Sequence, residues 1–226
     1  MYNYNKKRFF MRKIILLLFA LFLYGFNYSK IETNIVTTSK YHAIIDKQIK
    51  AGITGYVIHN NMVIAKAISN GKLNVSYLPF IKLKNSALAT PKLTPQKGDK
   101  IIFGLYNHRW LLIAPNQKIY LNTIKNYPNV TFINSDIFAN YFESKPEKKD
   151  FQKFCKDFNV GIIDFILDNE YIVDCESFVV LDKKNTTNQK YTKPFFTNYE
   201  KFNTSLFSSI PENWINYYKT LFKKGK

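Results

Sequence analysis

The sequence has little of the chemistry that enzymes need. It contains only two cysteines and three histidines in 226 residues. No histidine has a second one at H-x-x-x-H spacing, and the cysteines do not form C-x-x-C, so we expect no metal site. The chain also lacks a G-x-S-x-G motif and a glycine-rich phosphate loop, the usual hydrolase and nucleotide-binding signatures. We therefore expect a non-enzymatic protein with no cofactor.

Acidic residues are scarce as well, with 16 Asp and Glu against 33 Lys and Arg. Five of the basic residues lie in residues 1–29, and the remaining 28 leave the rest of the chain with a net charge of about +12. A basic domain favours anionic partners such as headgroups, acidic glycans or acidic protein patches. No zinc knuckle or RNP pattern occurs, so we do not expect nucleic acid as a partner.

No apolar run reaches the roughly 20 residues that span a bilayer comfortably. Residues 1–29 instead combine five cations with the shorter apolar run "IILLLFALFLYGF" at 14–26, the pattern of a secretory signal. An A-x-A cleavage site is missing, so an uncleaved N-terminal anchor is the alternative and would be the chain's contact with the membrane. We expect an exported protein, either at the cell surface and outer membrane or in the periplasm.

The two cysteines, Cys155 and Cys175, have two interpretations. In an oxidising compartment an even number of cysteines predicts one disulfide. Two buried free thiols are the alternative, because sequence alone does not show whether the side chains reach one another. A hydrolase built on Cys155 or His108 would require a cleft and a catalytic partner.

Short apolar runs separated by turn residues predict strands in the first part of the domain. "GITGYVIHNNMVIAKAI" indicates a hairpin around the turn-forming residues His59, Asn60 and Asn61. From Tyr41 a strand is expected, with a helix starting at Ser39 as the alternative. We predict a small β-barrel or sandwich over about residues 40–122.

The sequence of the second part, about residues 123–184, predicts an αβ segment. In "SKPEKKDFQKFCKDFNVG", residues Phe151, Phe154, Cys155 and Phe158 recur at helical spacing and share one face. "IIDFILDNEYIVDC" then predicts a closing β-hairpin, and its carboxylates are interpreted as polar edge and turn residues. The fold class is α+β, with the domain covering residues 30–184.

Residues 185–226 predict a basic, aromatic tail. "KYTKPFFTNYEKFNTSLF" is interpreted as a strap packed over the domain, with a membrane-surface segment as the alternative. "SIPE" at 209–212 is a capping box and predicts a terminal helix. The expected helix places Trp214, Tyr217, Tyr218, Leu221 and Phe222 on one face.

The stretch "ALATPKLTPQKGDKIIFGLYNHRWLLIAPNQKIYL", residues 87–121, resembles the N-terminal domain of bacterial plasminogen-binding proteins of the PgbA type. P-K-L-x-P-x-K-G-D-K is the most specific part. The similarity continues through "TFINSDIFANYF" and "KKDFQKFCKDFNVGIIDFILDNEYIVDCESFVVLDKK" and fades after residue 184. Family members continue into a long charged C-terminal region beyond the point where this sequence stops.

The resemblance implies a surface protein that recruits host plasminogen, a host interaction associated with virulence. Plasminogen captures lysine through kringle modules, which offer acids to the ammonium, an aromatic trough to the methylenes and basic groups to a terminal carboxylate. Lys226 is the predicted contact because a C-terminal lysine carries both charges. Lys223 and Lys224 would add electrostatic steering.

The alternative function is a scaffold or adaptor in the periplasm or envelope. Its partner would be an envelope component or another protein. The loop at 84–100 or the inside of the barrel would form its contact surface.

Overall fold

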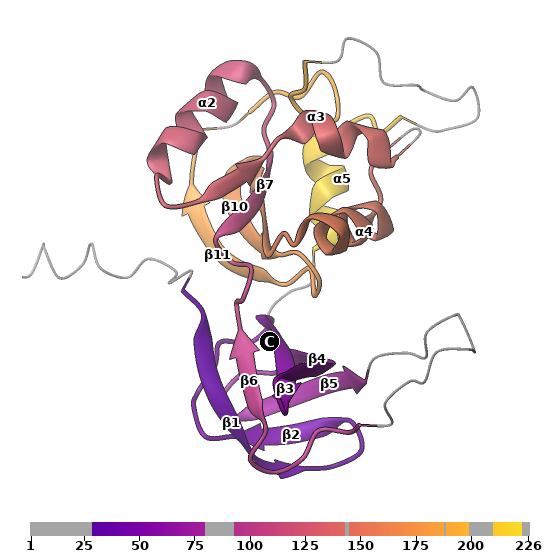
Figure 1. Ribbon diagram of the computed structural model, residues 1–226. Coiled ribbons are helices and arrows are strands. Elements are labelled where there is room, and N and C mark those ends of the chain that lie inside the picture. Colours follow the sequence, from indigo (N-terminus) through magenta and orange to yellow (C-terminus); the bar gives the residue numbers. More distant parts are fainter. Residues whose placement is uncertain (1–28, 80–92, 143–144, 188, 199–209, 223–226) are drawn as a thin grey trace, which may run out of the picture.

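A computed structural model describes residues 29–79, 93–142, 145–187, 189–198 and 210–222 of the chain. In these residues a closed six-stranded barrel is followed by a five-stranded sheet with helices on both faces (Figure 1). The prediction of an α+β fold is confirmed, and the first part is a barrel rather than a sandwich.

The barrel is built from six short antiparallel strands. In chain order they are β1 (Ile31–Thr38), β2 (His42–Ile45), β3 (Thr54–His59), β4 (Met62–Ser69), β5 (Asn74–Pro79) and β6 (Lys100–Phe103). Their order around the barrel is β1-β2-β5-β4-β3-β6, and β6 pairs with β1 to close it. Closure leaves no free strand edge in this part of the fold.

Apolar side chains fill the barrel interior. Ile35, Ile45, Val57, Val75 and Ile101 are each at most 2% exposed. Their alternation with exposed neighbours is the period-two pattern of a strand with one buried face. The interior is therefore packed core, and the suggestion that an adaptor would bind its partner inside the barrel is wrong.

The predicted hairpin "GITGYVIHNNMVIAKAI" is confirmed as β3 and β4. Asn60 and Asn61 both have positive φ, 47° and 63°. Two consecutive positive φ values define the two-residue turn whose twist matches a hairpin, and asparagine tolerates that conformation.

The barrel lies earlier in the sequence than predicted. It begins at Ile31 and ends at Phe103, whereas the sequence indicated about residues 40–122. The strand β1 was missed, and β7 (Arg109–Ile113), assigned to the barrel from the sequence, belongs to the second sheet. A short apolar strand carries no local signal of which sheet it joins, because pairing is a tertiary contact.

The second sheet has the order β11-β10-β9-β7-β8. Besides β7, its strands are β8 (Thr131–Ile133), β9 (Ile162–Ile166), β10 (Asn169–Asp174) and β11 (Val180–Asn185). β7 is parallel to both β8 and β9, and β9, β10 and β11 are antiparallel. The hairpin of β9 and β10 confirms the predicted closing hairpin.

Helices cover both faces of this sheet. They are α2 (Gln117–Asn126), α3 (Ser135–Phe138), the single 3-10 turn η1 (Ala139–Tyr141), α4 (Lys148–Phe158) and α5 (Trp214–Leu221). The aromatic cluster on one face unites α3, α4 and α5 with the sheet. The opposite face packs Leu112 and Ile166 against Tyr120 of α2. The central strands are thus buried on both sides, as in other parallel sheets.

The helix α4 matches its sequence pattern. Phe151, Phe154 and Cys155 are buried, and Phe158 packs beside them. Glu147 and Asp150 form a reciprocal capping box at its start. These contacts orient the helix so that Cys155 faces the sheet.

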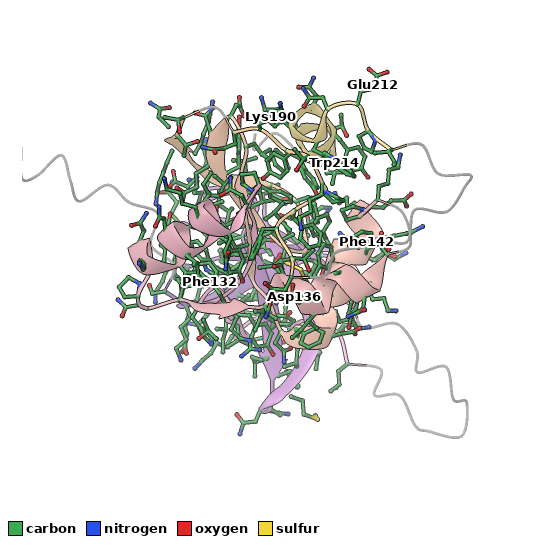
Figure 2. The ribbon with its side chains drawn as sticks, turned by 90° about the horizontal axis from the view of Figure 1, so that it is seen from above. Phe132, Asp136, Phe142, Lys190, Glu212 and Trp214 are labelled. Atoms are coloured by element: carbon green, nitrogen blue, oxygen red, sulfur yellow. A yellow bond between two sulfur atoms is a disulfide. The ribbon has the colours of Figure 1, made fainter. Side chains whose placement is uncertain are left out.

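The terminal helix α5 is also present, but it begins differently. Its N-cap is Asn213, whose side chain accepts from the Asn216 N–H at 3.1 Å, and not the predicted Ser209, which lies outside the described residues. Trp214 is 6% exposed and Tyr218 is fully buried. Figure 2 shows Trp214 directed into the α/β part and Glu212 directed outward. The α5 segment of the expected tail is therefore part of the core.

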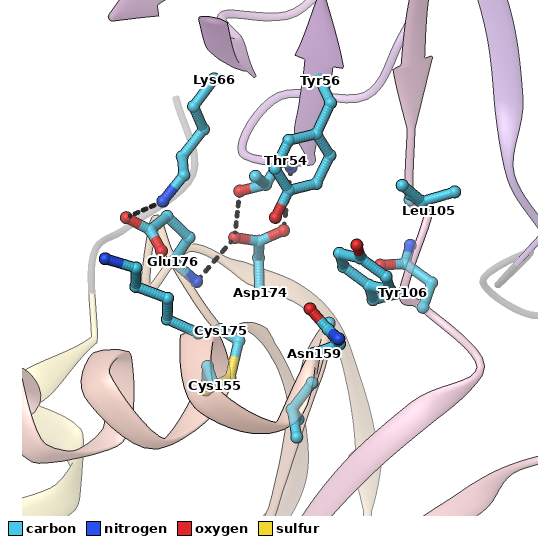
Figure 3. A pocket seen from close by; sticks show the side chains of 15 residues that line it. Thr54, Tyr56, Lys66, Leu105, Tyr106, Cys155, Asn159, Asp174, Cys175 and Glu176 are labelled. Atoms are coloured by element: carbon cyan, nitrogen blue, oxygen red, sulfur yellow. Dashed lines mark hydrogen bonds and ion pairs between the residues drawn. A yellow bond between two sulfur atoms is a disulfide. The ribbon is translucent and has the colours of Figure 1, made fainter. Parts of the chain in front are cut away.

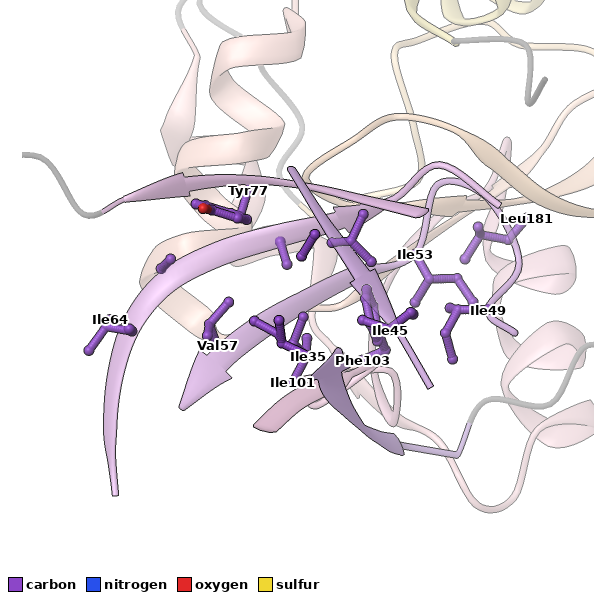
Figure 4. Close-up of a cluster of buried hydrophobic side chains, with 14 of the residues drawn as sticks. Ile35, Ile45, Ile49, Ile53, Val57, Ile64, Tyr77, Ile101, Phe103 and Leu181 are labelled. Carbon is purple, nitrogen blue, oxygen red and sulfur yellow. The ribbon is translucent and has the colours of Figure 1, made fainter. Parts of the chain in front are cut away.

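The barrel and the second sheet share one hydrophobic cluster. Ile49 and Ile53 of the barrel belong to the same cluster as Trp110, Ile172 and Leu181 of the second sheet. Figure 4 shows Ile49 and Ile53 beside Leu181. The two parts are consequently held in one arrangement, and groups at their boundary have defined positions.

Candidate functional site

The lysines predicted to contact plasminogen, Lys223, Lys224 and Lys226, lie outside the described residues. They stay a prediction. The described chain ends at Phe222, whose ring packs against Phe165 and Tyr171 at centroid distances of 5.1 and 5.3 Å. Among the residues that the structure describes, no helix has the length and apolar character needed to cross a bilayer.

The predicted disulfide is confirmed between Cys155 of α4 and Cys175, which follows β10. Their Cα atoms lie 6.1 Å apart, within the usual span of such a bond. The sulfur of Cys155 is therefore not a free thiolate, and His108 is exposed. The hydrolase interpretation built on Cys155 loses its nucleophile.

A pocket of about 200 Å³ lies where the barrel meets the α/β part (Figure 3). Three segments far apart in the sequence line it. They are the barrel strands β3 and β4, residues 104–107 between the barrel and β7, and the ends of α4 and β10 with the disulfide. This pocket is the candidate site because it brings together side chains from both parts of the described chain.

Asp174 forms the floor of the pocket and joins the two parts of the molecule. Its carboxylate accepts hydrogen bonds from the backbone N–H and hydroxyl of Thr54 at 2.9 and 2.7 Å. It also accepts from the backbone N–H groups of Glu176 and Ser177 at 3.1 and 2.9 Å. Burial raises the pKa of the Asp174 carboxyl, and the bonds from Ser177 and Thr54 oppose that effect. With four donors, this carboxylate is already satisfied.

An ion pair crosses the rim. Lys66 Nζ of β4 lies 2.8 Å from Glu176 Oε1, and both side chains are partly exposed. Lys156, in the last turn of α4, also lines the pocket and is exposed. It has no hydrogen bond or ion pair within the described ranges. At the rim, Lys156 is therefore an ammonium without an ion-pair partner among the described residues.

Two tyrosines form the aromatic wall. The rings of Tyr56 and Tyr106 meet edge to face, with centroids 5.6 Å apart and planes at 74°. Burial raises the pKa of Tyr56, and neighbouring Tyr106, Glu176 and Asp174 raise it further. The Tyr56 phenol therefore stays protonated at neutral pH. Neither the Tyr56 nor the Tyr106 hydroxyl has a hydrogen-bond partner among the described residues.

Asn107 places an unpaired amide at the pocket. The residue is 3% exposed, and its side chain makes no hydrogen bond to the part of the chain that the structure describes. A Cβ atom at Gly104 would lie 2.6 Å from the Asn107 amide nitrogen, so glycine there leaves room for it. At Gly161 a Cβ atom would lie 2.5 Å from the Tyr106 carbonyl oxygen. The two glycines allow the connecting segment to approach the sheet this closely.

Sequence reasoning did not find this pocket. Asp174 and Glu176 were interpreted as polar edge and turn residues, and Thr54 and Tyr56 as part of a hairpin. The local signals are Gly104 and Gly161, each of which lies beside a turn that contains asparagine. The contact between Thr54 and Asp174 spans 120 residues, which no local pattern reports.

Comparison with known proteins identifies relatives of the chain. The family model described as "Plasminogen-binding protein pgbA N-terminal" matches residues 30–224. Two curated relatives, each named "Plasminogen-binding protein PgbA", come from Helicobacter pylori strains J99 and 26695. Each is 32% identical to the chain over 184 residues. No solved structure matches significantly.

The match extends further along the chain than the sequence resemblance indicated. It runs to residue 224 and so includes the segment after 184 where the similarity was expected to fade. The alignments cover 77% of this chain and 41% of each relative. The chain therefore spans about two fifths of the length of the curated relatives it matches.

Proposed function

The chain belongs to the family of PgbA N-terminal domains of plasminogen-binding proteins, and we propose that it binds plasminogen as a non-enzymatic, exported surface protein. The family match over residues 30–224 is the observation that carries this proposal. The cationic and apolar segment at residues 1–29 supports export, and the excess of basic residues supports an acidic partner surface.

The chemistry of capture is lysine recognition by plasminogen's kringle modules. Lys226 is the proposed contact because a C-terminal lysine offers an ammonium and a carboxylate together. An acid in the kringle site would pair with the ammonium, and an aromatic trough would cover the methylene stem. Lys223 and Lys224 act at longer range by attracting the acidic site.

Other lysines of the described chain supply an internal comparison. Lys118 and Lys125 of α2 are exposed and form no hydrogen bond or ion pair with described residues. They present ammonium groups without an adjacent chain terminus. If the terminal carboxylate matters, removing these two charges will have little effect on plasminogen binding.

The test measures binding of the purified chain to immobilised plasminogen, with and without 6-aminohexanoate as a lysine analogue. We expect the analogue to abolish binding and deletion of Lys226 to weaken it by at least about tenfold, the effect of losing one charge-assisted pair. Lysine-sensitive binding that survives the deletion would move the site to internal lysines. Absence of saturable binding at micromolar plasminogen would overturn the proposed function.

A matched pair of double variants distinguishes long-range electrostatic attraction of plasminogen from direct contact with it. Lys223→Gln/Lys224→Gln and Lys118→Gln/Lys125→Gln remove the same charge from different places. We expect the first pair alone to slow association, and its effect to disappear at high salt because screening suppresses long-range attraction. Equal slowing by both pairs would show that net charge, and not the position of the lysines, determines the rate.

The second candidate function is an envelope adaptor, and the pocket described above favours it. Its proposed loop contact at 84–100 lies partly outside the described residues. Asp99, at the end of that loop, is turned inward and lies 2.7 Å from His59 Nδ1. Residence confined to the periplasm would favour this function over plasminogen capture.

A further inference from the structure

We propose that the pocket between the barrel and the α/β part binds a sugar ring that carries a carboxylate, such as a uronic acid. This ligand site is separate from the lysines of the proposed plasminogen contact and does not depend on them. It is built from side chains whose hydrogen-bonding capacity the described protein leaves unused.

The unused groups define what the ligand must offer. Asn107, a residue that is 3% exposed, contributes an amide, and Tyr56 and Tyr106 contribute hydroxyls. Asn159, in the left-handed C-cap position of α4, contributes a second amide. Amides and phenols each donate and accept, so their natural complement is a set of hydroxyl groups that also do both.

The shape and surface suit one sugar ring. A volume of about 200 Å³ has room for about six waters at ~30 Å³ each. Figure 3 shows the Tyr56 and Tyr106 rings beside the polar floor, so the site combines apolar carbon with converging polar groups. That combination is typical of small-molecule sites.

The charged group at the rim that lacks a partner among the described residues is a lysine, which favours a ligand with one negative charge. Glu176 is paired with Lys66, and Asp174 accepts four hydrogen bonds, so neither acid is free for a ligand cation. Lys156 keeps an unpaired ammonium at the rim. A carboxylate on the ligand would form an ion pair with the Lys156 ammonium.

The end of α4 argues against a phosphate. Lys156 and Asn159 lie at its C-terminus, where the helix dipole is negative. Phosphate sites more often use helix N-termini and their free N–H groups. A monoanion held by one lysine is therefore favoured over a dianion.

The experiment is a titration of the full chain, followed by amide NMR, with glucuronate and galacturonate. Glucose, glucose 6-phosphate and lysine serve as comparison ligands. We expect saturable shifts at Asn107, Gly161 and Glu176 with a uronate, and weaker binding of glucose. Methyl glucuronide, in which the anomeric hydroxyl is blocked, distinguishes the end of a glycan from a free sugar acid.

Two variants and a matched control test the residues. Lys156→Gln should weaken uronate binding by about tenfold, because it removes a charge-assisted contact. Tyr106→Phe, which removes only a hydroxyl, should weaken it severalfold. Lys125→Gln, the corresponding last-turn lysine of α2, should leave it unchanged. Spectra outside the pocket report whether each variant is folded.

The proposal is overturned if no uronate gives saturable shifts at the pocket. Tighter binding of glucose 6-phosphate or lysine would also overturn it, as would uronate affinity that Lys156→Gln and Tyr106→Phe leave unchanged. None of these outcomes bears on plasminogen binding, which the Lys226 deletion tests separately.

Discussion

At the scale of single residues, Asp164 is an unusual feature of the sheet. It lies in β9 opposite Leu112 of β7 and Ile172 of β10. It is 0% exposed, and neither of its carboxylate oxygens has a hydrogen-bond partner in the described residues. Burial raises its pKa well above the ordinary value, Glu170 raises it further and Lys184 opposes the shift. The carboxyl therefore keeps its proton to a higher pH than an exposed aspartate does.

Replacing Asp164 by Asn should remove a pH-dependent loss of stability. The folded pKa is above the unfolded value of about 3.9, so the folded state keeps a proton that the unfolded chain releases. Stability therefore falls as the pH rises from about 4 toward the folded pKa. Each pKa unit corresponds to about 1.4 kcal/mol. Urea denaturation of both proteins between pH 4 and 8 measures the difference in slope.

The control for Asp164→Asn is Glu212→Gln, which removes an exposed acid just before α5. Its stability curve should run parallel to that of the unchanged chain. Parallel curves for Asp164→Asn as well would show that Asp164 does not have a raised pKa in the folded state.

At the scale of elements, the disulfide attaches α4 to the end of β10. It closes a loop with a sequence separation of 20 residues. Both cysteines are nearly fully buried, at 4% and 1% exposed. The bond therefore restricts the unfolded chain and adds little new contact to an already packed face.

The double variant Cys155→Ala/Cys175→Ala should lose about 3 kcal/mol of unfolding free energy, the loop-closure contribution for this length. Urea denaturation measures it. Dithiothreitol should destabilise the unchanged chain by a similar amount and leave the variant unaffected. Equal sensitivity of both proteins to the reductant would contradict this account.

Helix α5 is the second element whose attachment can be tested. Tyr218 is fully buried, and its hydroxyl donates to the Pro194 carbonyl at 2.7 Å. Lys219 Nζ lies 2.6 Å from the Asp168 carboxylate. Most of the attachment energy should come from the buried ring, because partly exposed ion pairs contribute little.

Tyr218→Ala should cost about 3–5 kcal/mol, the usual range for deleting a large buried aromatic side chain. Thr220→Ala on the same helix is exposed and should cost less than about 0.5 kcal/mol. Denaturant unfolding gives both values, and hydrogen exchange of the α5 amides gives the local effect. A small cost for Tyr218→Ala would mean that α5 does not stabilise the domain.

At the scale of the whole molecule, the barrel and the α/β part should unfold together. They share a hydrophobic cluster, and hydrogen bonds from Thr54 to Asp174 and from Ser177 Oγ to the Gly52 carbonyl cross their boundary. Two domains that fold independently would share few contacts of this kind. A continuous core predicts one cooperative transition.

The two tryptophans allow this to be measured. Trp110 lies in the hydrophobic cluster that the barrel and the second sheet share. Trp214, the first residue of α5, lies in the aromatic cluster on one face of the second sheet. Trp110→Phe and Trp214→Phe each leave one fluorescent probe. The single-probe transition of each variant should coincide with its own circular-dichroism transition. Two separated transitions would show that the parts unfold independently.

The sequence by itself determined the local elements whose signals lie within a few residues. The paired asparagines specify the β3–β4 turn, and the aromatic spacing specifies the buried face of α4. The stretch at 87–121 also identified the family by its resemblance, which the comparison confirmed. In contrast, α2 was missed, although Asn116 is a recognisable N-cap.

Only the tertiary structure decided which strands share a sheet, whether the two cysteines reach one another and where a ligand could bind. β7 belongs to the second sheet because it pairs with β8 and β9, and both of these strands lie later in the chain. The pocket forms because Gly104 and Gly161 let Asn107 and Tyr106 meet residues that are distant in sequence. Such contacts depend on the relative placement of whole elements, whereas turn and helix signals depend only on neighbouring residues.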